Sequence, residues 1–521
     1  MRSIPKTLYF KSGHAASVES LPENILNVLS SGWSLKALGS SNERREFYDT
    51  FEWQAFEKGI IIVKKKKTLF LADLDTGMET ASLPFSGNPS FFFPDALAPC
   101  NLKEKLWLCS TVRAFIKLCS VDAMMRSYRV LDENEKTIAL LTSESLRIVD
   151  HHVREPFTHF FALSPYRGYE DEIAHLEKSL MNNEDIDSIF EARELFKVTM
   201  LAAGHTVQGY SSKISLTLDP NAPIHESVRH LLQFTFSVMR LNEAGIKKNI
   251  DSEFLHDYRV AIRRTRSILK QLKGVFDADE TAYYLNIFRE LGKRTNELRD
   301  KDVYLLQQTT YFNYLPPSLQ PSLKIFFKTI AASRKMLHKR FSRYLSSDSY
   351  KSFLEEWGAC LNRPSAPEQE QIPYASLSTR SVAVKTIKKA WKKVIIHGRL
   401  VSQETTDAEL HGLRIDCKKL RYLLEFFASI FPQQTITPVI RQLKRLQDNL
   451  GDFVDFTVQL CFLHEQLALM PTDKLLAAAT GGLMAVLFQK KEESRLKFHK
   501  TFMSFDQEQT RTLLHELLTN D

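Results

Sequence analysis

Two basic segments of the chain match each other at a fixed distance. HDYRVAIRRTR spans residues 256–266 and HGLRIDCKKLR spans residues 411–421, an offset of 155 residues. A second pair, TNELRDKDV at 295–303 and LGDFVDFTV at 450–458, has the same offset. The first alignment pairs the cations of the two segments: His256 with His411, Arg259 with Arg414, Arg263 and Arg264 with Lys418 and Lys419, and Arg266 with Arg421. Two matches at one offset predict a tandem repeat whose units are far longer than those of a solenoid.

Both basic segments have the periodicity of an amphipathic helix. Tyr258 and Ile262 in the first segment and Leu269 just after it recur at the spacing of an apolar stripe, as do Leu413 and Leu420 in the second. At about 100° per residue, the cations of the first segment share a separate sector of about 80°, which is formed by His256, Arg259, Arg263, Arg266 and Lys270. We therefore expect this basic face to point away from the core.

A solvated charged face is the simplest explanation of such a helix. Solvated faces usually interleave acids three or four residues away, whereas like charges at that spacing repel each other by a few tenths of a kcal/mol per pair. The same arrangement occurs twice, which favours a surface that binds an anion. Further cations occur in neighbouring helical segments: Arg289, Lys293, Arg340, Lys389, Lys393 and Lys444.

The chain has two halves of different composition. Residues 1–205 contain short β-rich runs such as GIIIVKKKKTLFLADL between Gly, Pro and Ser clusters, which predicts an α+β domain with antiparallel strands. Residues 206–222 are predicted to be a linker, and residues 223–521 have the helical periodicity of an all-α domain. A Pro-rich interruption separates the first repeat, about 223–360, from the second, about 379–521.

Composition narrows the classes of protein. The six cysteines are scattered without a C-x-x-C pair, which disfavours a disulfide framework or a zinc site and favours a reduced, intracellular setting. The longest apolar run, residues 475–488, is too short to span a bilayer and predicts a buried helix. The N-terminal MRSIPKTLYFKSG lacks the apolar core of a signal peptide. We expect no membrane association.

The histidines at the starts of the two basic helices have two interpretations. A single histidine there is more often a capping or hydrogen-bonding residue than a metal ligand, and neither helix offers a second ligand at the required spacing on the same face. A histidine beside a phosphate can donate a hydrogen bond from either ring nitrogen. We predict no metal site, no cofactor and no catalytic residue.

The helical half resembles the CHAD family, the conserved-histidine α-helical domain. The resemblance covers residues 218–521 and depends on NEAGIKKNIDSEFLHDYRVAIRRTRSIL, ELHGLRIDCKKLRYLLEFF and LKRLQDNLGDFVD. It implies two pseudo-symmetric four-helix units and a central groove that binds inorganic polyphosphate. The candidates carried over by motif are His256, Arg259, Arg263, Arg264, His411, Arg414, Lys418 and Lys419. The cations Arg266, Lys270, Arg289, Lys293, Arg340, Lys389, Lys393, Arg421 and Lys444 complete the predicted site.

The N-terminal half resembles the CYTH or triphosphate-tunnel fold, an antiparallel β-barrel that often precedes a CHAD domain. The similarity is carried by RREFYDTFEWQAFEKGIIIVKKKK and SPYRGYEDEIAHL. The family's E-x-E-x-K motif aligns with TLYFK, in which Thr7 and Tyr9 replace the glutamates and Lys11 is retained. Tunnel enzymes hydrolyse triphosphates with a divalent metal held by carboxylates, so this half is predicted to be a degenerate, inactive tunnel domain.

These features predict non-catalytic binding of inorganic polyphosphate or a similar phosphate-rich polyanion by a cytoplasmic protein that associates with polyphosphate granules. Two alternatives stay open at this level: a metal-dependent triphosphatase or polyphosphatase, and a nucleic-acid-binding protein, since basic helices bind any phosphate backbone by counterion release. The basic face shows little aromatic interleaving for base stacking, which disfavours the last. The sequence does not specify an oligomeric state.

Overall fold

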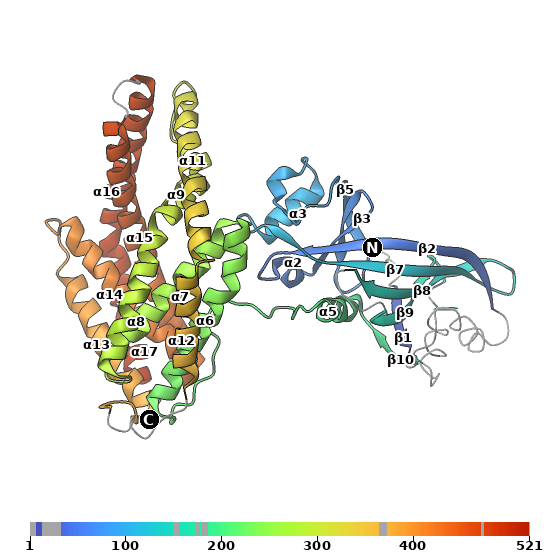
Figure 1. The fold of residues 1–521 in the computed structure, drawn as a ribbon, viewed down its shortest axis with the longest axis horizontal. Coiled ribbons are helices and arrows are strands. Elements are labelled where there is room, and N and C mark those ends of the chain that lie inside the picture. Colours follow the sequence, from blue (N-terminus) through green and yellow to red (C-terminus); the bar gives the residue numbers. More distant parts are fainter. Residues whose placement is uncertain are drawn as a thin grey trace. The chain divides into compact units, whose positions relative to one another are not determined.

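The chain consists of two compact units, residues 1–211 and 212–521 (Figure 1). They are described here from a computed structural model that covers residues 7–12, 33–149, 156–169, 186–363, 372–469 and 474–519, and residues 171, 172, 174 and 178.

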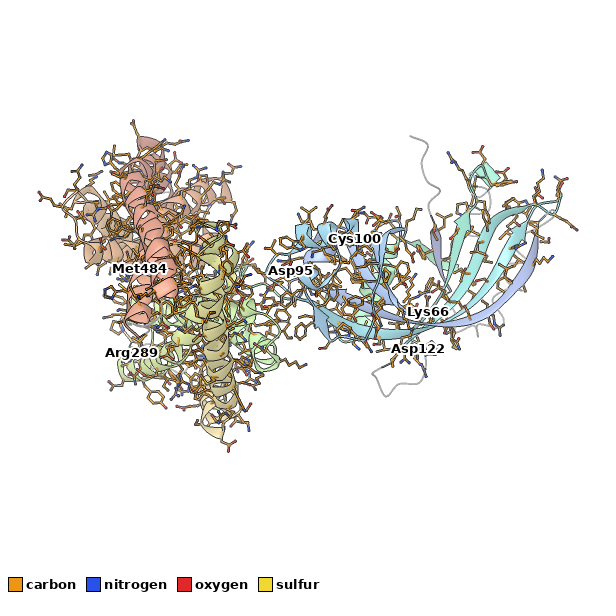
Figure 2. The ribbon with its side chains drawn as sticks, turned by 90° about the horizontal axis from the view of Figure 1, so that it is seen from above. Lys66, Asp95, Cys100, Asp122, Arg289 and Met484 are labelled. Carbon is orange, nitrogen blue, oxygen red and sulfur yellow. The ribbon has the colours of Figure 1, made fainter. Side chains whose placement is uncertain are left out.

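The first unit is built on one antiparallel sheet. Its strand order is β10-β1-β9-β8-β7-β2-β3-β4-β5, and β6 pairs with β7. Figure 2 shows this sheet curved into an open half-barrel. The α+β class predicted for this half is confirmed. The strands are β1 (Leu8–Ser12), β2 (Ser34–Asp49), β3 (Ile60–Lys65), β4 (Thr68–Asp73), β5 (Glu79–Pro84), β6 (Phe91–Phe92), β7 (Phe115–Leu131), β8 (Thr137–Ile148), β9 (Thr158–Pro165) and β10 (Ile186–Phe190).

Both faces of this sheet are covered by helices over part of their area. Successive strand residues point to opposite faces, so each face has its own core. On one face, Phe196 of α5 (Ala192–Ala202) packs with Val63 and Phe160. On the other, Leu102 and Leu106 of α3 (Asn101–Cys109) and Ala55 of α2 (Gln54–Glu57) pack in a second cluster.

The second unit is helical, as predicted. The first repeat contributes α6 (Ile224–Lys248), α7 (Ser252–Gln271), α8 (Ala278–Arg294), α9 (Asn296–Leu306), α10 (Gln308–Asn313), α11 (Gln320–Tyr344) and α12 (Asp348–Asn362). The second contributes α13 (Thr379–Arg399), α14 (Asp407–Phe426), α15 (Gln433–Leu469), α16 (Lys474–Phe505) and α17 (Glu508–Thr519). No described helix is long and apolar enough to cross a membrane.

The two basic helices, α7 and α14, both begin at side-chain caps. The Asp251 carboxylate accepts hydrogen bonds from the first turn of α7, and the Thr406 hydroxyl forms a capping box with Glu409 at the start of α14. Such caps satisfy backbone N–H groups that have no partner inside the helix, and each typically stabilises the helix by about 1 kcal/mol. The basic side chains therefore project from helices with fixed starting points.

The repeats share a hydrophobic core at one end of the unit. Tyr304 and Phe326 of the first repeat form a buried cluster with Leu463 and Leu483 of the second. Figure 1 shows α11, α15 and α16 extending together beyond the other helices of this unit. The two repeats thus pack against each other through this shared core.

Residues 212–222 contain no helix or strand, yet they are bound to the helices that follow. The backbone N–H of Leu218 donates to Ser429 Oγ at 3.0 Å, and that of Thr379 donates to the Ala222 carbonyl at 2.9 Å. The Leu218 side chain is buried. This segment packs as part of the helical unit.

Candidate anion-binding site

The basic helices of the two repeats meet through their cations. Arg263 Nε on α7 donates a hydrogen bond of 2.7 Å to the hydroxyl of Tyr422 on α14. One residue further along, Arg264 Nη2 lies 3.7 Å from Glu425 Oε2 on α14. The aligned basic helices of the two repeats therefore share one interface.

At this interface, the pKa of the Lys418 ammonium group is strongly lowered. Burial and the charges of Arg414 and Arg263 lower the pKa of its ammonium group to about 8, and Asp455 opposes the shift. Like charges and desolvation both disfavour the protonated amine. Lys418 is therefore held in a strongly positive environment.

Arg259 has a similar environment on the first repeat. Its Nη1 donates to Thr295 Oγ1 at 2.5 Å, to Asn296 Oδ1 at 3.0 Å and to the Gly292 carbonyl at 3.3 Å. Burial and the charge of Arg263 lower its pKa to about 10. These three acceptors are neutral, so they orient the guanidinium group without cancelling its charge.

Each repeat brings one carboxylate to this group of cations. Asp455 Oδ1 lies 3.1 Å from Arg414 Nη2, and Asp300, the equivalent of Asp455, raises the pKa of Arg259. The sequence alignment paired these two acids through the second repeated motif. They face four cations, which we call the central cluster: Arg259, Arg263, Arg414 and Lys418. Positive charge is in excess by about two.

Arg264 and Arg421 hold the two helices together. Arg264 donates to the Ser212 carbonyl and pairs with Glu425, which also lies 2.6 Å from Arg421 Nε. Arg421 Nη1 in addition donates to Gln447 Oε1 at 3.1 Å. The shared carboxylate compensates both charges in part, so these residues have a structural role in the interface.

Arg266 and Arg289 extend the positive region from α7 to α8. Burial, Arg289 and Arg263 together lower the pKa of Arg266. Arg289 is exposed on the helical unit (Figure 2). Among the described residues, no hydrogen-bond acceptor is found for the buried Nε of Arg266 or of Arg414.

Two predicted site residues instead surround a buried acid. Lys393 Nζ and Lys419 Nζ lie 3.1 and 3.2 Å from Asp416 Oδ1, and His397 Nδ1 lies 2.9 Å from Asp416 Oδ2. On α14, Lys419 is rotated by about 140° from Arg414. The structure thus places Lys393 and Lys419 away from the central cluster, because adjacent positions on a helix point to different sides.

The remaining predicted cations lie at the surface. Lys293 pairs with Glu290 at 2.8 Å, and Arg340 pairs with Glu297 at 3.4 Å. Exposed pairs of this kind contribute little to stability. Four more side chains are exposed: Lys270, Lys389, Lys444 and His411. His256, at the start of α7, is half-buried.

Sequence reasoning missed the neutral groups that position the cluster. Tyr422 directly follows the second basic segment, and its equivalent in the first repeat is Ser267, so the alignment gave it no signal. Thr295 and Asn296 lie in the second repeated motif, in which the two repeats match at the Asp and Val positions. The described residues include no group of three or more His, Cys, Asp or Glu side chains suited to a metal ion.

In the first unit, the aligned tunnel motif lies on the sheet face that packs against α5. The Tyr9 ring lies 6.0 Å from that of Phe160, and burial together with the Glu144 charge raises the Tyr9 pKa to about 12. Glu144 Oε2 also pairs with Arg45 Nη1 at 2.7 Å. The Lys11 side chain lies outside the described residues. This face contains an apolar core and a paired arginine.

Asp49, a carboxylate that could have served a metal, has a structural role. Its oxygens accept hydrogen bonds from the backbone N–H groups of Thr50, Ala55 and Phe56 at 2.6 to 2.9 Å. Asp49 is buried and fixes the turn that leads into α2.

Comparisons with known proteins concern the helical unit. The family model described as the CHAD domain matches residues 230–464. No curated protein matches the chain. The solved CHAD domain from the plant Ricinus communis is 21% identical, with a TM-score of 0.48, over 58% of this chain and 96% of that chain. PptA from Streptomyces chartreusis is 14% identical, with a TM-score of 0.43, over 54% of this chain and 100% of that chain. The CYTH resemblance of the first unit stays a prediction. The CHAD resemblance of the helical unit is confirmed by the family match over residues 230–464.

Proposed function

We propose that the helical unit binds inorganic polyphosphate, or a linear polyanion of the same chemistry, at the central cluster and does not hydrolyse it. The CHAD family, whose model matches residues 230–464, is associated with polyphosphate. The observation that carries the proposal is Lys418, whose pKa is lowered to about 8 beside Arg414 and Arg263. A half-buried amine held among like charges supports an anionic ligand at this position.

Binding of an anion would relieve the unfavourable charge of this site. Two like charges about 4 Å apart repel by roughly 4 kcal/mol at the effective dielectric constant of a protein surface. The two carboxylates, Asp300 and Asp455, offset part of the charge of the four cations. A phosphate oxygen between Arg263 and Lys418 would turn repulsion into attraction on both sides and would accept charge-assisted hydrogen bonds.

The two-repeat construction favours a linear ligand over a single phosphate ion. Arg259 and Arg263 come from α7, whereas Arg414 and Lys418 come from α14. A chain of phosphates can contact both sets at once, and each additional contact releases counterions. Affinity is then expected to rise with chain length.

The first unit supports the part of the proposal that says the protein does not hydrolyse polyphosphate. Hydrolysis of a triphosphate with Mg²⁺ requires carboxylate oxygens that place the metal against the phosphate. At the aligned positions, Thr7 hydrogen-bonds to Ser164, and Tyr9 packs against Phe160. Asp49 is committed to backbone N–H groups.

The binding test compares the intact chain with R263Q/K418Q. Long-chain polyphosphate is titrated at several salt concentrations, and the slope of log affinity against log salt is measured. We expect the variant to bind more weakly, with a slope reduced by about 0.7 per lost contact if polyphosphate behaves like single-stranded nucleic acid. The matched control is K497Q/K500Q, which removes two exposed charges from α16. Equal affinities and slopes for both variants would refute the proposed site.

Two further measurements address the alternatives. Release of orthophosphate from tripolyphosphate with Mg²⁺ or Mn²⁺ is expected to stay below about 1 s⁻¹, the low end of usual enzyme rates. RNA is expected to compete poorly with polyphosphate for the intact chain. Metal-dependent turnover above that rate, or displacement of polyphosphate by an equal charge of RNA, would contradict the proposal.

A further inference from the structure

Helix α11 carries an unusual charge pattern outside the central cluster. Over Gln320–Tyr344 it contains no Asp or Glu, while its basic residues are Lys324, Lys328, Arg334, Lys335, Lys339, Arg340 and Arg343. Charged surface helices usually mix both signs, because like charges four residues apart destabilise a helix.

Four of these cations form one straight row. Lys324, Lys328, Lys335 and Lys339 fall within about 60° of the helix circumference and span about 22 Å along its axis. We call them the α11 stripe. All four are exposed, whereas Leu323, Phe326, Phe327 and Ile330 on the same helix are buried in the shared core.

The α11 stripe is not neutralised by neighbouring elements. Within the described parts of the chain, none of its four ammonium groups forms an ion pair with a carboxylate. The acids of α9 reach other residues of α11: Asp302 pairs with Arg334 at 2.7 Å, and Glu297 pairs with Arg340 at 3.4 Å. The stripe therefore keeps its full charge at the surface.

Helix α9 contacts both the central cluster and helix α11, which carries the stripe. Arg259 hydrogen-bonds to Thr295 and Asn296, which begin α9. From the same helix, Glu297 pairs with Arg340 on α11. The central cluster and the C-terminal part of α11 thus both contact the first turn of one short helix.

We propose that the α11 stripe is a second contact surface for the same linear polyanion, so that a long chain bound at the central cluster continues along α11. This inference rests on the proposed function. A single row of like charges matches a linear polyanion in shape and sign. A helix that binds a membrane inserts a broad apolar face into the lipid, but the apolar face of α11 is buried in the protein core, and only Ile325 and Met336 among its large apolar side chains are exposed.

The consequence is selectivity for chain length. A short anion fills the central cluster alone, whereas a long one gains the α11 contacts as an intramolecular second step at high effective concentration. The stripe then acts as a length-sensing extension of the site.

The test uses the full chain with K324Q/K328Q/K335Q/K339Q, and the charge-preserving K324R/K328R/K335R/K339R as its matched variant. Circular dichroism checks that both remain helical, which we expect because all four positions are exposed. Affinity is measured for tripolyphosphate and for long-chain polyphosphate, each over a range of salt. We expect the Gln variant to lose about ten-fold or more in long-chain affinity, with a smaller salt slope. Its affinity for tripolyphosphate is expected to be unchanged, and the Arg variant is expected to behave as the unaltered chain.

The outcomes separate this inference from the proposed function. Normal long-chain affinity and salt slope in the Gln variant would show that the stripe is a solvated face. An equal loss for short and long chains would also refute it, because length selectivity would be missing. Loss of binding to anionic vesicles with intact polyphosphate binding would assign the surface to membranes and overturn the inference. If the unaltered chain binds neither polyphosphate, the proposed function itself fails.

Discussion

Lys418 lies beside Arg263, the residue 155 positions earlier in the chain, and the charge of Arg263 helps to lower the Lys418 pKa to about 8. These two residues occupy equivalent places in the two repeats. Near-symmetry therefore brings two like charges together at the interface, and several properties of the protein depend on this juxtaposition.

Polyphosphate affinity is expected to fall as the pH rises through about 8. In the unliganded protein the Lys418 ammonium group begins to lose its proton there. A bound anion raises that pKa again, so binding takes up a proton above this pH and becomes weaker as protons become scarcer. Titrations from about pH 7 to about pH 10, up to the ordinary lysine pKa, measure the effect.

The control for this pH dependence is K418R, because arginine has a higher pKa than lysine and keeps its proton around pH 8, where Lys418 titrates. We expect K418R to retain binding and to flatten the pH profile in that window. A profile that is equally steep in K418R would assign the pH dependence to another group.

Replacement of Lys418 by methionine is expected to stabilise the protein while it weakens binding. The lowered pKa corresponds to an unfavourable free energy on the order of 3 kcal/mol for the charged amine in the folded state. Methionine has a similar length and no charge, so K418M removes this penalty. Urea denaturation at neutral pH is expected to show a gain of about 1–3 kcal/mol.

The same proton linkage predicts the direction in which the stability of the unaltered chain changes with pH. Between the folded pKa of Lys418 and its higher unfolded value, the unfolded chain binds more protons, so stability rises with pH through this window. We expect K418M to lose that rise. A K418M protein that is less stable at neutral pH would show that the amine is favourably paired.

The sequence predicted the basic helices and their relationship well. Helical periodicity placed Arg259 and Arg263 on one face, and the repeat paired Arg263 with Lys418 before any fold was considered. The offset was informative because related helices pack by the same rules in both repeats. It also identified Asp300 and Asp455, which the structure brings to equivalent cations.

Features that depend on single side chains could not be predicted in this way. Lys419 is adjacent to Lys418 in sequence, but one step on a helix turned it toward Asp416. Asp416 corresponds to Ala261 in the first repeat, so the alignment gave no warning of a competing acid. Similarly, Tyr422 contacts Arg263 across the interface, and such contacts between elements are set by packing.

Removal of the Asp455 charge is expected to strengthen polyanion binding. Its carboxylate lies 3.1 Å from Arg414 and is largely exposed, so it competes with a phosphate for the same cation. In D455N we expect a few-fold gain in affinity, since an exposed ion pair is worth up to about 1 kcal/mol. The control is D348N, at an exposed acid on α12. An affinity gain of the same size in D348N would indicate a general effect of net charge.

The residue at which an isolated fragment of the helical unit begins is expected to affect the stability of that fragment. A fragment of residues 212–521 keeps the Ser212 carbonyl that accepts from the buried Arg264, and it keeps the buried Leu218. A fragment that starts at Pro223 loses both and leaves a guanidinium group with less compensation. Full burial of one leucine contributes about 1.5–3 kcal/mol, so we expect the shorter fragment to be less stable by at least that amount in urea denaturation.

L218A in the longer fragment should reproduce part of the loss, because it removes the apolar contact and keeps the backbone hydrogen bonds. Equal stability of all three proteins would mean that residues 212–222 contribute nothing to the helical unit, and that the domain begins at α6.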